Sequence, residues 1–335
     1  MGIAPETDRD VDPSPVENVA GGASPAIQTS NLVKRYRTTT ALDGFSMTVR
    51  RGEVFGFLGP NGAGKTTAVK LLVGLSRATS GEAWVLGAPA GDRATRRRIG
   101  YLPELFRYQD WLSAREVLML HCELAGIARG ARRREIDSAL ELVGLTSRGR
   151  DRVGTFSKGM QQRLGLGVAL LGQPELVFLD EPTSALDPVG RHDVREIIRE
   201  LKRRNATVFL NSHLLGEVEQ VCDRVAVIHR GRLIAVGTMD ELRGEESSVR
   251  LRLGGLDAAG IQALRRFGEV DEEGDRYLVR GIDHETVPRL VAEVVRLGGR
   301  VYAVDPSQQS LEDRFLELLG GEDDAGTDNR APDPA

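Results

Sequence analysis

The apolar residues in the middle of the chain alternate between short unbroken runs and stripes with helical spacing. Unbroken runs bounded by turn residues predict strands. They occupy residues 41–50, 53–58, 176–179, 207–210, 225–228 and 233–236. Helical spacing predicts helices at residues 114–126, 133–143 and 158–171, and in a segment carrying Val194, Ile197, Ile198 and Leu201. Because strands alternate with helices, we predict an α/β core.

The pattern starts again after Gly244. Alternating apolar residues predict a strand near residues 249–253, and a helix, two short strands, a second helix and a strand at residues 301–304 follow. This β-α-β-β-α-β order is that of the split βαβ, ferredoxin-like arrangement. A last helix at residues 310–319 closes it. We therefore predict a second, small α+β domain at residues 246–320, with a role in regulation or dimerisation.

Both ends of the chain lack periodic apolar residues. Residues 1–27 and 321–335 are rich in Pro, Gly, Asp and Ala, which predicts disordered tails. The N-terminus is acidic and has no apolar core of the kind a signal peptide carries, and no apolar run approaches the length of a membrane span. The sequence therefore predicts a cytosolic protein.

The composition is that of an ordinary globular protein. Of the 335 residues, 40% are hydrophobic and 28% are charged, and the net charge is −4. No global basic field exists, so nucleic acid is disfavoured as a partner. The two cysteines, Cys122 and Cys222, lie in segments with helical patterning, which predicts neither a disulfide framework nor a metal cluster.

A glycine-rich segment, GPNGAGKTT, lies between a predicted strand and a predicted helix that begins at Lys65. It fits the phosphate-loop pattern GxxxxGK[ST], in which backbone N–H groups and a helix N-terminus bind phosphate oxygens. Lys65 would reach the β- and γ-phosphates of ATP, and Thr66 would ligate Mg²⁺. The predicted nucleotide-binding residues here are Gly59, Pro60, Asn61, Gly62, Ala63, Gly64, Lys65, Thr66 and Thr67.

Two acidic residues, Asp180 and Glu181, follow the apolar run at residues 176–179. Such a run is typical of a strand buried on both faces of a parallel sheet. Asp180 would hold Mg²⁺, and Glu181 would orient and polarise the attacking water. We therefore predict ATP hydrolysis, with two carboxylates that merely cap a helix as the alternative.

With these motifs, residues 28–245 resemble the nucleotide-binding subunit of ATP-binding cassette (ABC) transporters, whose core carries a helical subdomain, here at about residues 103–172. FSKGM at residues 156–160 lies where the family has its signature sequence. Ser157 looks like the N-cap of the following helix. The resemblance implies that the signature residues bind the γ-phosphate held by a second subunit in a head-to-tail homodimer. Those residues are Ser157, Lys158, Gly159 and Met160.

Other positions match the family too. The resemblance assigns adenine stacking to Tyr36, for which a surface tyrosine on a strand is the alternative. It assigns the contact with the γ-phosphate to His213, in the segment FLNSH. The loop SALD would contact the opposite subunit through Ser184, Ala185, Leu186 and Asp187.

Some positions depart from the family pattern. Lys158 and Met160 replace the usual Gly and Gln of the signature, and Glu104 replaces the glutamine expected to help ligate Mg²⁺. With these departures and the small C-terminal domain, the chain resembles the subfamily of exporters for drugs, sodium, lipids or polysaccharides. In that subfamily, ATPase and permease are separate chains.

This resemblance implies a protein peripheral to the cytoplasmic face of the membrane, docked on an integral permease through residues 103–117. Phe106, Tyr108 and Trp111 suit a docking surface, and core packing is the equal alternative. Two other classes remain open. One is a soluble cassette ATPase that acts on ribosomes or DNA, and the other is a phosphotransferase, which would leave FSKGM and SALD unexplained.

Overall fold

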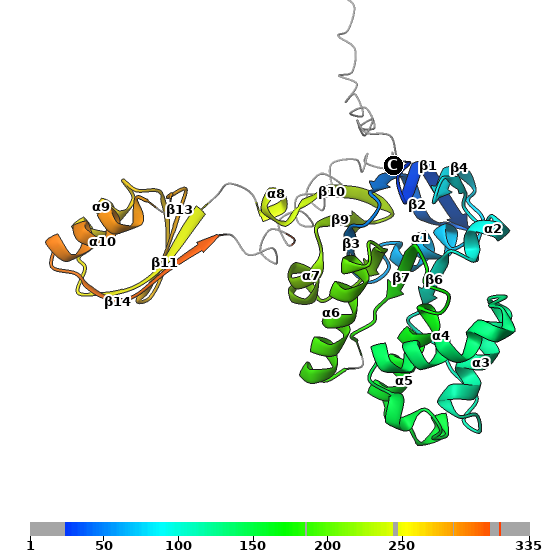
Figure 1. Cartoon of the computed structure of the whole chain (residues 1–335). Helices are drawn as coiled ribbons and strands as arrows, with labels where there is room; N and C mark the ends of the chain where they lie inside the picture. Colours follow the sequence, from blue (N-terminus) through cyan, green and yellow to red (C-terminus); the bar gives the residue numbers. More distant parts are fainter. Residues whose placement is uncertain (1–23, 185, 244–246, 284, 309–314, 316–335) are drawn as a thin grey trace, which may run out of the picture.

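The computed structural model describes residues 24–184, 186–243, 247–283, 285–308 and Phe315. Residues 24–243, here called the N-terminal unit, hold a six-stranded sheet of order β10-β9-β3-β8-β7-β6 and a four-stranded sheet of order β2-β1-β4-β5 (Figure 1). The strands of the larger sheet are β3 (Val54–Leu58), β6 (Ile99–Leu102), β7 (Leu176–Asp180), β8 (Thr207–Asn211), β9 (Arg224–His229) and β10 (Arg232–Thr238).

The centre of the six-stranded sheet is buried at every position of β3, β7 and β8. Unbroken apolar runs of this kind suit a parallel sheet covered on both faces, and β3, β6, β7, β8 and β9 pair in parallel. The predicted α/β core is therefore confirmed. Since parallel strands end at the same edge, the segments that follow β3, β7 and β8 leave the sheet side by side, where open α/β sheets bind ligands.

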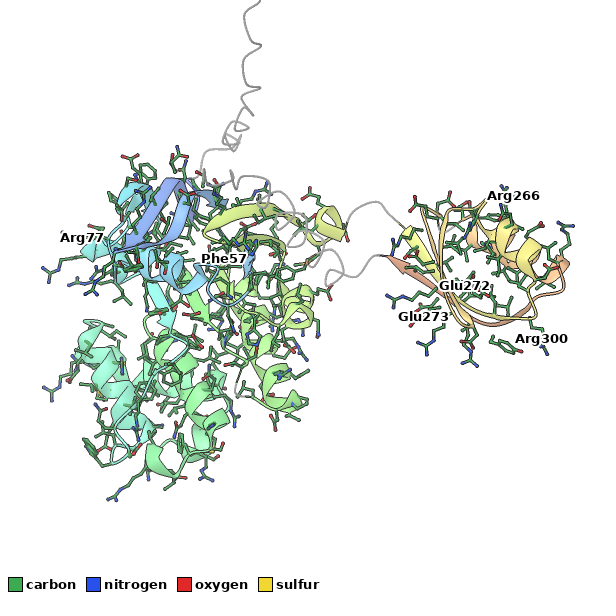
Figure 2. All side chains as sticks on the ribbon, turned by 180° about the vertical axis from the view of Figure 1, so that it is seen from behind. Phe57, Arg77, Arg266, Glu272, Glu273 and Arg300 are labelled. Atoms are coloured by element: carbon green, nitrogen blue, oxygen red, sulfur yellow. The ribbon has the colours of Figure 1, made fainter. Side chains whose placement is uncertain are left out.

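The smaller sheet is antiparallel and was only partly predicted. It consists of β1 (Ile27–Tyr36), β2 (Thr39–Val49), β4 (Ser80–Val85) and β5 (Ala88–Pro89). Between the two sheets, Phe57 packs edge-on against Phe45, with 5.7 Å between the ring centroids, and at a tilt against Phe209, with 5.3 Å between the centroids. Figure 2 shows Phe57 inside this unit and Arg77 projecting from its surface. The smaller sheet thus covers one face of the larger.

Helices complete the N-terminal unit. Figure 1 shows α3, α4 and α5 gathered together, and with the segments between them they form the predicted helical subdomain. The helices are α1 (Lys65–Leu72), α2 (Arg93–Arg96), α3 (Ala114–Leu124), α4 (Arg129–Leu142), α5 (Lys158–Ala169), α6 (Pro188–Arg203), α7 (Leu215–Val221) and α8 (Met239–Arg243), with short 3-10 turns at Thr146–Arg148 and Val153–Thr155. The start of α4 lies before the predicted residue 133, because its first turn carries arginines that favour helix without adding apolar spacing.

A capping box begins α3. The Ser113 hydroxyl accepts a hydrogen bond from the backbone N–H of Glu116, and the Glu116 carboxylate accepts one from the backbone N–H of Ser113 at 2.7 Å. We expect Ser113→Ala to lower the free energy of unfolding by about 1 kcal/mol, because an N–H donor of the helix loses its partner. Urea unfolding measures this loss. Ser147→Ala, at an exposed position in a 3-10 turn, is the matched control, and an equal loss there would contradict the role of the cap.

Residues 247–308, here called the C-terminal unit, have the predicted element order and a core of their own. The four-stranded sheet has the order β12-β13-β11-β14, and all its strand pairs are antiparallel. Figure 1 shows α9 and α10 on one side of it, and Figure 2 labels Glu272, Glu273 and Arg300, which are exposed on its strands. The elements are β11 (Ser247–Gly254), α9 (Ala258–Leu264), β12 (Glu269–Glu273), β13 (Arg276–Arg280), α10 (Val287–Arg296) and β14 (Arg300–Gln308).

Several predictions about the ends of the chain fall outside the described residues. These are residues 1–23 of the tail predicted at residues 1–27, the tail at residues 321–335 and, apart from Phe315, the helix at residues 310–319. The predicted disorder is wrong at the end of the first tail, because Ala26 and Ile27 are buried and Ile27 begins β1. Within the described ranges, no helix has the length and apolar character to cross a membrane. Of the two cysteines, Cys122 is buried in α3, whereas Cys222 is the C-cap of α7 and so ends the helix in which it was predicted.

Candidate functional site

A cavity of about 510 Å³ opens at the carboxyl edge of the six-stranded sheet. Its wall brings together five segments that are far apart in the sequence: the start of β2, the glycine-rich loop, Glu104, the segment after β7, and the end of β8 with the residues after it. Its lining residues are Thr39, Thr40, Ala41, Pro60, Asn61, Gly62, Gly64, Lys65, Thr66, Thr67, Glu104, Glu181, Ser184, Asn211 and His213.

The glycine-rich loop is built around positions that exclude a side chain. A Cβ on Gly59 would lie 2.3 Å from the carbonyl oxygen of Ile228, and one on Gly64 would lie 2.3 Å from that of Ala41. Gly64 is also the N-cap of α1 with a left-handed φ of 107°, which favours glycine. The loop therefore follows the sheet closely and lines the cavity together with the N-terminus of α1, an arrangement that suits phosphate binding.

Lys65 lies at the start of α1, with its ammonium held inside this loop. Its Nζ donates hydrogen bonds to the carbonyl oxygens of Gly59 at 2.6 Å and Pro60 at 3.2 Å. Burial lowers the pKa of Lys65, and the carboxylates of Glu181 and Asp180 oppose that shift. Two backbone carbonyl oxygens thus hold a positive charge at the glycine-rich loop, where it can attract a polyphosphate.

Asp180 is the last residue of β7, and it is 1% exposed. Its Oδ1 accepts a hydrogen bond from the Asn211 amide, and its Oδ2 is buried without a partner among the described residues. Burial, together with the nearby Glu104 and Glu181, raises the pKa of Asp180. A buried carboxylate with a free oxygen, held by Asn211 of the cavity wall that also carries Thr66, provides oxygen donors of the kind that Mg²⁺ prefers.

Glu181 follows with a left-handed backbone, at a φ of 53°. Left-handed non-glycine residues cost about 1–3 kcal/mol and persist where the surroundings hold them. Here the Glu181 N–H donates to the carbonyl oxygen of Asn211 at 2.9 Å, and Glu181 Oε2 lies 2.7 Å from His213 Nδ1. This turn directs the carboxylate and the imidazole to the cavity wall as a pair.

The signature residues do not line this cavity. Ser157 caps α5, with its hydroxyl accepting from the backbone N–H of Met160 at 3.3 Å, and the Met160 side chain packs against the core. Lys158 is exposed. A Cβ on Gly159 would lie 3.4 Å from Leu186 Cδ2, so the signature and the SALD loop meet within one chain.

The remaining predicted positions lie around these segments. The Ser184 hydroxyl donates to the carbonyl oxygen of Glu181 at 3.1 Å, Asp187 caps α6, and Ala185 lies outside the described residues. Tyr36 is 45% exposed at the end of β1, and Lys34 Nζ lies 4.7 Å from its ring centroid. Its ring is therefore accessible to a stacking partner.

The predicted docking segment divides into half-buried and exposed aromatic and apolar residues. Phe106 and Tyr108 pack against the core of the N-terminal unit, with 5.4 Å between their ring centroids, and burial raises the pKa of Tyr108. Core packing is thus the correct alternative for these two. Leu105 and Trp111, by contrast, are 87% and 70% exposed.

Sequence reasoning missed four residues of the cavity wall: Thr39, Thr40, Ala41 and Asn211. Asn211 carried a signal, because it is the polar residue at the carboxyl end of an apolar run, as Asp180 is. The other three come from β2, and Ala41 reaches the cavity because its backbone approaches Gly64.

Comparison with known proteins agrees with this geometry. Residues 42–184 match the family model described as ABC transporter. The bacitracin transport ATP-binding protein BcrA of Bacillus licheniformis is 37% identical over 307 residues, which cover 89% of this chain and 98% of BcrA. The Nod factor export ATP-binding protein I of Burkholderia orbicola is 36% identical over 297 residues, which cover 87% of this chain and 96% of that protein.

A solved structure of the ATP-binding subunit of an ABC transporter is also similar. It is 31% identical, with a TM-score of 0.60, and the match covers 65% of this chain and 92% of that one. Subunits of this family bind ATP and act with membrane permeases. Fold, cavity and relatives agree, and the chain belongs to the ABC transporter family as an ATP-binding subunit.

Proposed function

We propose that this chain hydrolyses ATP as a homodimer on the cytoplasmic face of a membrane, and that it powers export through a separate permease. One observation carries the proposal. The phosphate loop, Glu181 and His213 line one cavity, and Asp180 is hydrogen-bonded to Asn211 of its wall, whereas Ser157 and the rest of the signature do not line it. A second copy of the chain, placed head to tail, would bring its own signature to this cavity.

The residues of the cavity divide the work of hydrolysis. Lys65 and the loop N–H groups neutralise the β- and γ-phosphates, and Tyr36 stacks on adenine. Glu181 orients a water and takes its proton as the oxygen attacks the γ-phosphorus, while the bond to the bridging oxygen breaks and ADP leaves. A positioned base of this kind contributes about 10²–10⁴ in rate. His213, held by Glu181, contacts the γ-phosphate.

Mg²⁺ would be held by Thr66 and Asp180, and Glu104, which lines the same cavity as Thr66, would contact its waters. When bound, it would neutralise charge on the β- and γ-phosphates. Glu104 lies on the cavity wall and raises the pKa of Asp180, so replacement of glutamine by glutamate adds negative charge beside the site. That charge favours a cation.

The second copy would contribute the N-terminus of α5. Ser157 and the backbone N–H groups of Lys158, Gly159 and Met160 form the N-terminus of a twelve-residue helix, and a helix N-terminus favours binding of a γ-phosphate. Leu186 packs close to Gly159 in the same chain. The SALD loop, which follows Glu181, would therefore link the signature of one site to the carboxylates of the other.

The contact with the permease would use the exposed part of the docking segment. Glu104 lines the nucleotide cavity, and its neighbour Leu105 faces solvent, with Trp111 further along the same segment. Nucleotide and permease would thus act on adjacent residues of one loop. The export relative, named for Nod factor, supports the direction of transport.

We expect replacement of both Leu105 and Trp111 by alanine to abolish recovery of a membrane permease with the chain, because the exposed apolar surface at the contact is lost. The measurement is affinity purification from detergent-solubilised membranes, together with ATP hydrolysis by the isolated chain, which should stay within about twofold of wild type. Leu75→Ala is the control, since Leu75 is 64% exposed but lies after α1.

The purification also tests the proposal as a whole. Recovery of ribosomes or DNA by the wild-type chain, without any membrane protein, would contradict the role in transport and favour a soluble ATPase. Recovery of the same permease by the double variant would contradict only the assignment of the contact.

A further inference from the structure

Two polar residues end neighbouring strands beside the nucleotide cavity. Asp180 of β7 pairs in register with Asn211 of β8, and both residues are 1% exposed. Asn211 lines the cavity together with Lys65 and Thr66. It has no role in the mechanism described above, although it is as deeply buried as Asp180.

Asn211 holds both acidic residues of the site. Its side-chain Nδ2 donates a hydrogen bond to Asp180 Oδ1, which fixes the carboxylate and leaves its second oxygen without a partner among the described residues. Its backbone carbonyl accepts the N–H of Glu181 at 2.9 Å, where Glu181 turns into the left-handed conformation. One residue therefore sets the position of two carboxylates.

Two hydrogen-bond acceptors remain buried at this point. Asp180 Oδ2 and Asn211 Oδ1 have no partner among the described residues. Buried polar atoms are rarely left without a partner, because each one costs about 1–3 kcal/mol. Two buried acceptors on one pair of facing residues call for ligands that present donors, and the water molecules around a divalent cation are such donors.

We propose that Asn211 is a positioning residue of the cation site, orienting Asp180 through Nδ2 and accepting, through Oδ1, a hydrogen bond from a water on the cation. This inference rests on the proposed role of Mg²⁺ in the site. An amide suits the position because Asp180, Glu181 and Glu104 already place three carboxylates near the cavity. Asn211 adds an oxygen acceptor to them without a fourth negative charge.

The test measures cation affinity apart from nucleotide affinity. Mn²⁺ is the probe, titrated by electron paramagnetic resonance into the full chain with a non-hydrolysable ATP analogue, and the analogue is also titrated in EDTA. Asn211→Ala should weaken Mn²⁺ binding by about 10- to 100-fold, the usual effect of losing a residue that supports a ligand. Analogue binding in EDTA should change less than about twofold.

Val208→Ala is the control for general damage to β8, because Val208 is buried on the same strand and pairs with Val177, away from the cavity. It should leave Mn²⁺ affinity unchanged. Asn211→Asp should bind Mn²⁺ more tightly than Asn211→Ala, since an acceptor oxygen returns with added negative charge. It also provides a second test if the alanine variant fails to fold.

Three results would overturn the inference: wild-type Mn²⁺ affinity in Asn211→Ala, an equal loss of Mn²⁺ and metal-free analogue binding, or weaker binding in Asn211→Asp than in Asn211→Ala. A wild-type chain that binds the analogue but no Mn²⁺ would contradict the proposed metal site itself. The failure of the inference is thereby distinguishable from the failure of the proposed function.

Discussion

Glu181→Gln is expected to bind ATP with wild-type affinity and to hydrolyse it about 10²–10⁴ times more slowly. Glutamine has nearly the same shape and keeps an oxygen that faces His213, but its amide cannot take the proton of the attacking water. The left-handed turn should persist, because the backbone hydrogen bond to Asn211 does not involve the side chain. Phosphate release in the steady state gives the rate, and equilibrium binding of labelled ATP gives the affinity.

Glu196→Gln is a suitable control, because Glu196 is an exposed glutamate on α6 that pairs with Arg199. Its turnover should equal that of wild type. Hydrolysis at the wild-type rate in Glu181→Gln would show that another group accepts the proton, and the assignment of the base would have to move to a different residue of the cavity wall.

Lys65→Ala is expected to weaken ATP binding by about 10- to 100-fold. The ammonium is buried inside the loop, where hydrogen bonds to a charged group contribute about 1.5–3 kcal/mol each. The matched control is Lys70→Ala, an exposed lysine in the last turn of the same helix. Both variants lose one positive charge from α1, so only the position of that charge differs. Isothermal titration with ATP measures both.

An unchanged affinity in Lys65→Ala would mean that the glycine-rich loop does not hold the phosphates. An equal loss in both variants would mean that the general charge of α1 attracts ATP and that the contact with Lys65 is of little importance.

The parts of the fold that follow from local sequence were predictable. Unbroken apolar runs predicted β3, β7 and β8 because every position of these strands is buried. The start of α1 at Lys65 followed from the glycine-rich loop. β4, by contrast, was not predicted, because most of its residues are exposed or half-buried and it has no unbroken apolar run. Its pairing with β1 places it in the sheet, and that pairing is not local.

The candidate site likewise contains residues that local sequence could predict and contacts that it could not. Asp180 and Glu181 could be found because they follow one apolar run within a few residues. The link from Asn211 to Asp180 could not, because it depends on the register of two strands joined through α6. Burial also distinguishes Tyr108 from Trp111, two aromatic residues that composition cannot tell apart. Tyr108 packs against the core, whereas Trp111 is exposed to solvent.

The central claim is that two copies of the chain complete each ATP site, and the mass of Glu181→Gln in solution tests it most directly. Light scattering with ATP should give about twice the 36.5 kDa of one chain. Adding Ser157→Glu, which places a negative charge where the γ-phosphate of the opposite copy would bind, should return the mass to that of one chain while ATP stays bound. A single-chain mass for Glu181→Gln saturated with ATP would contradict the claim.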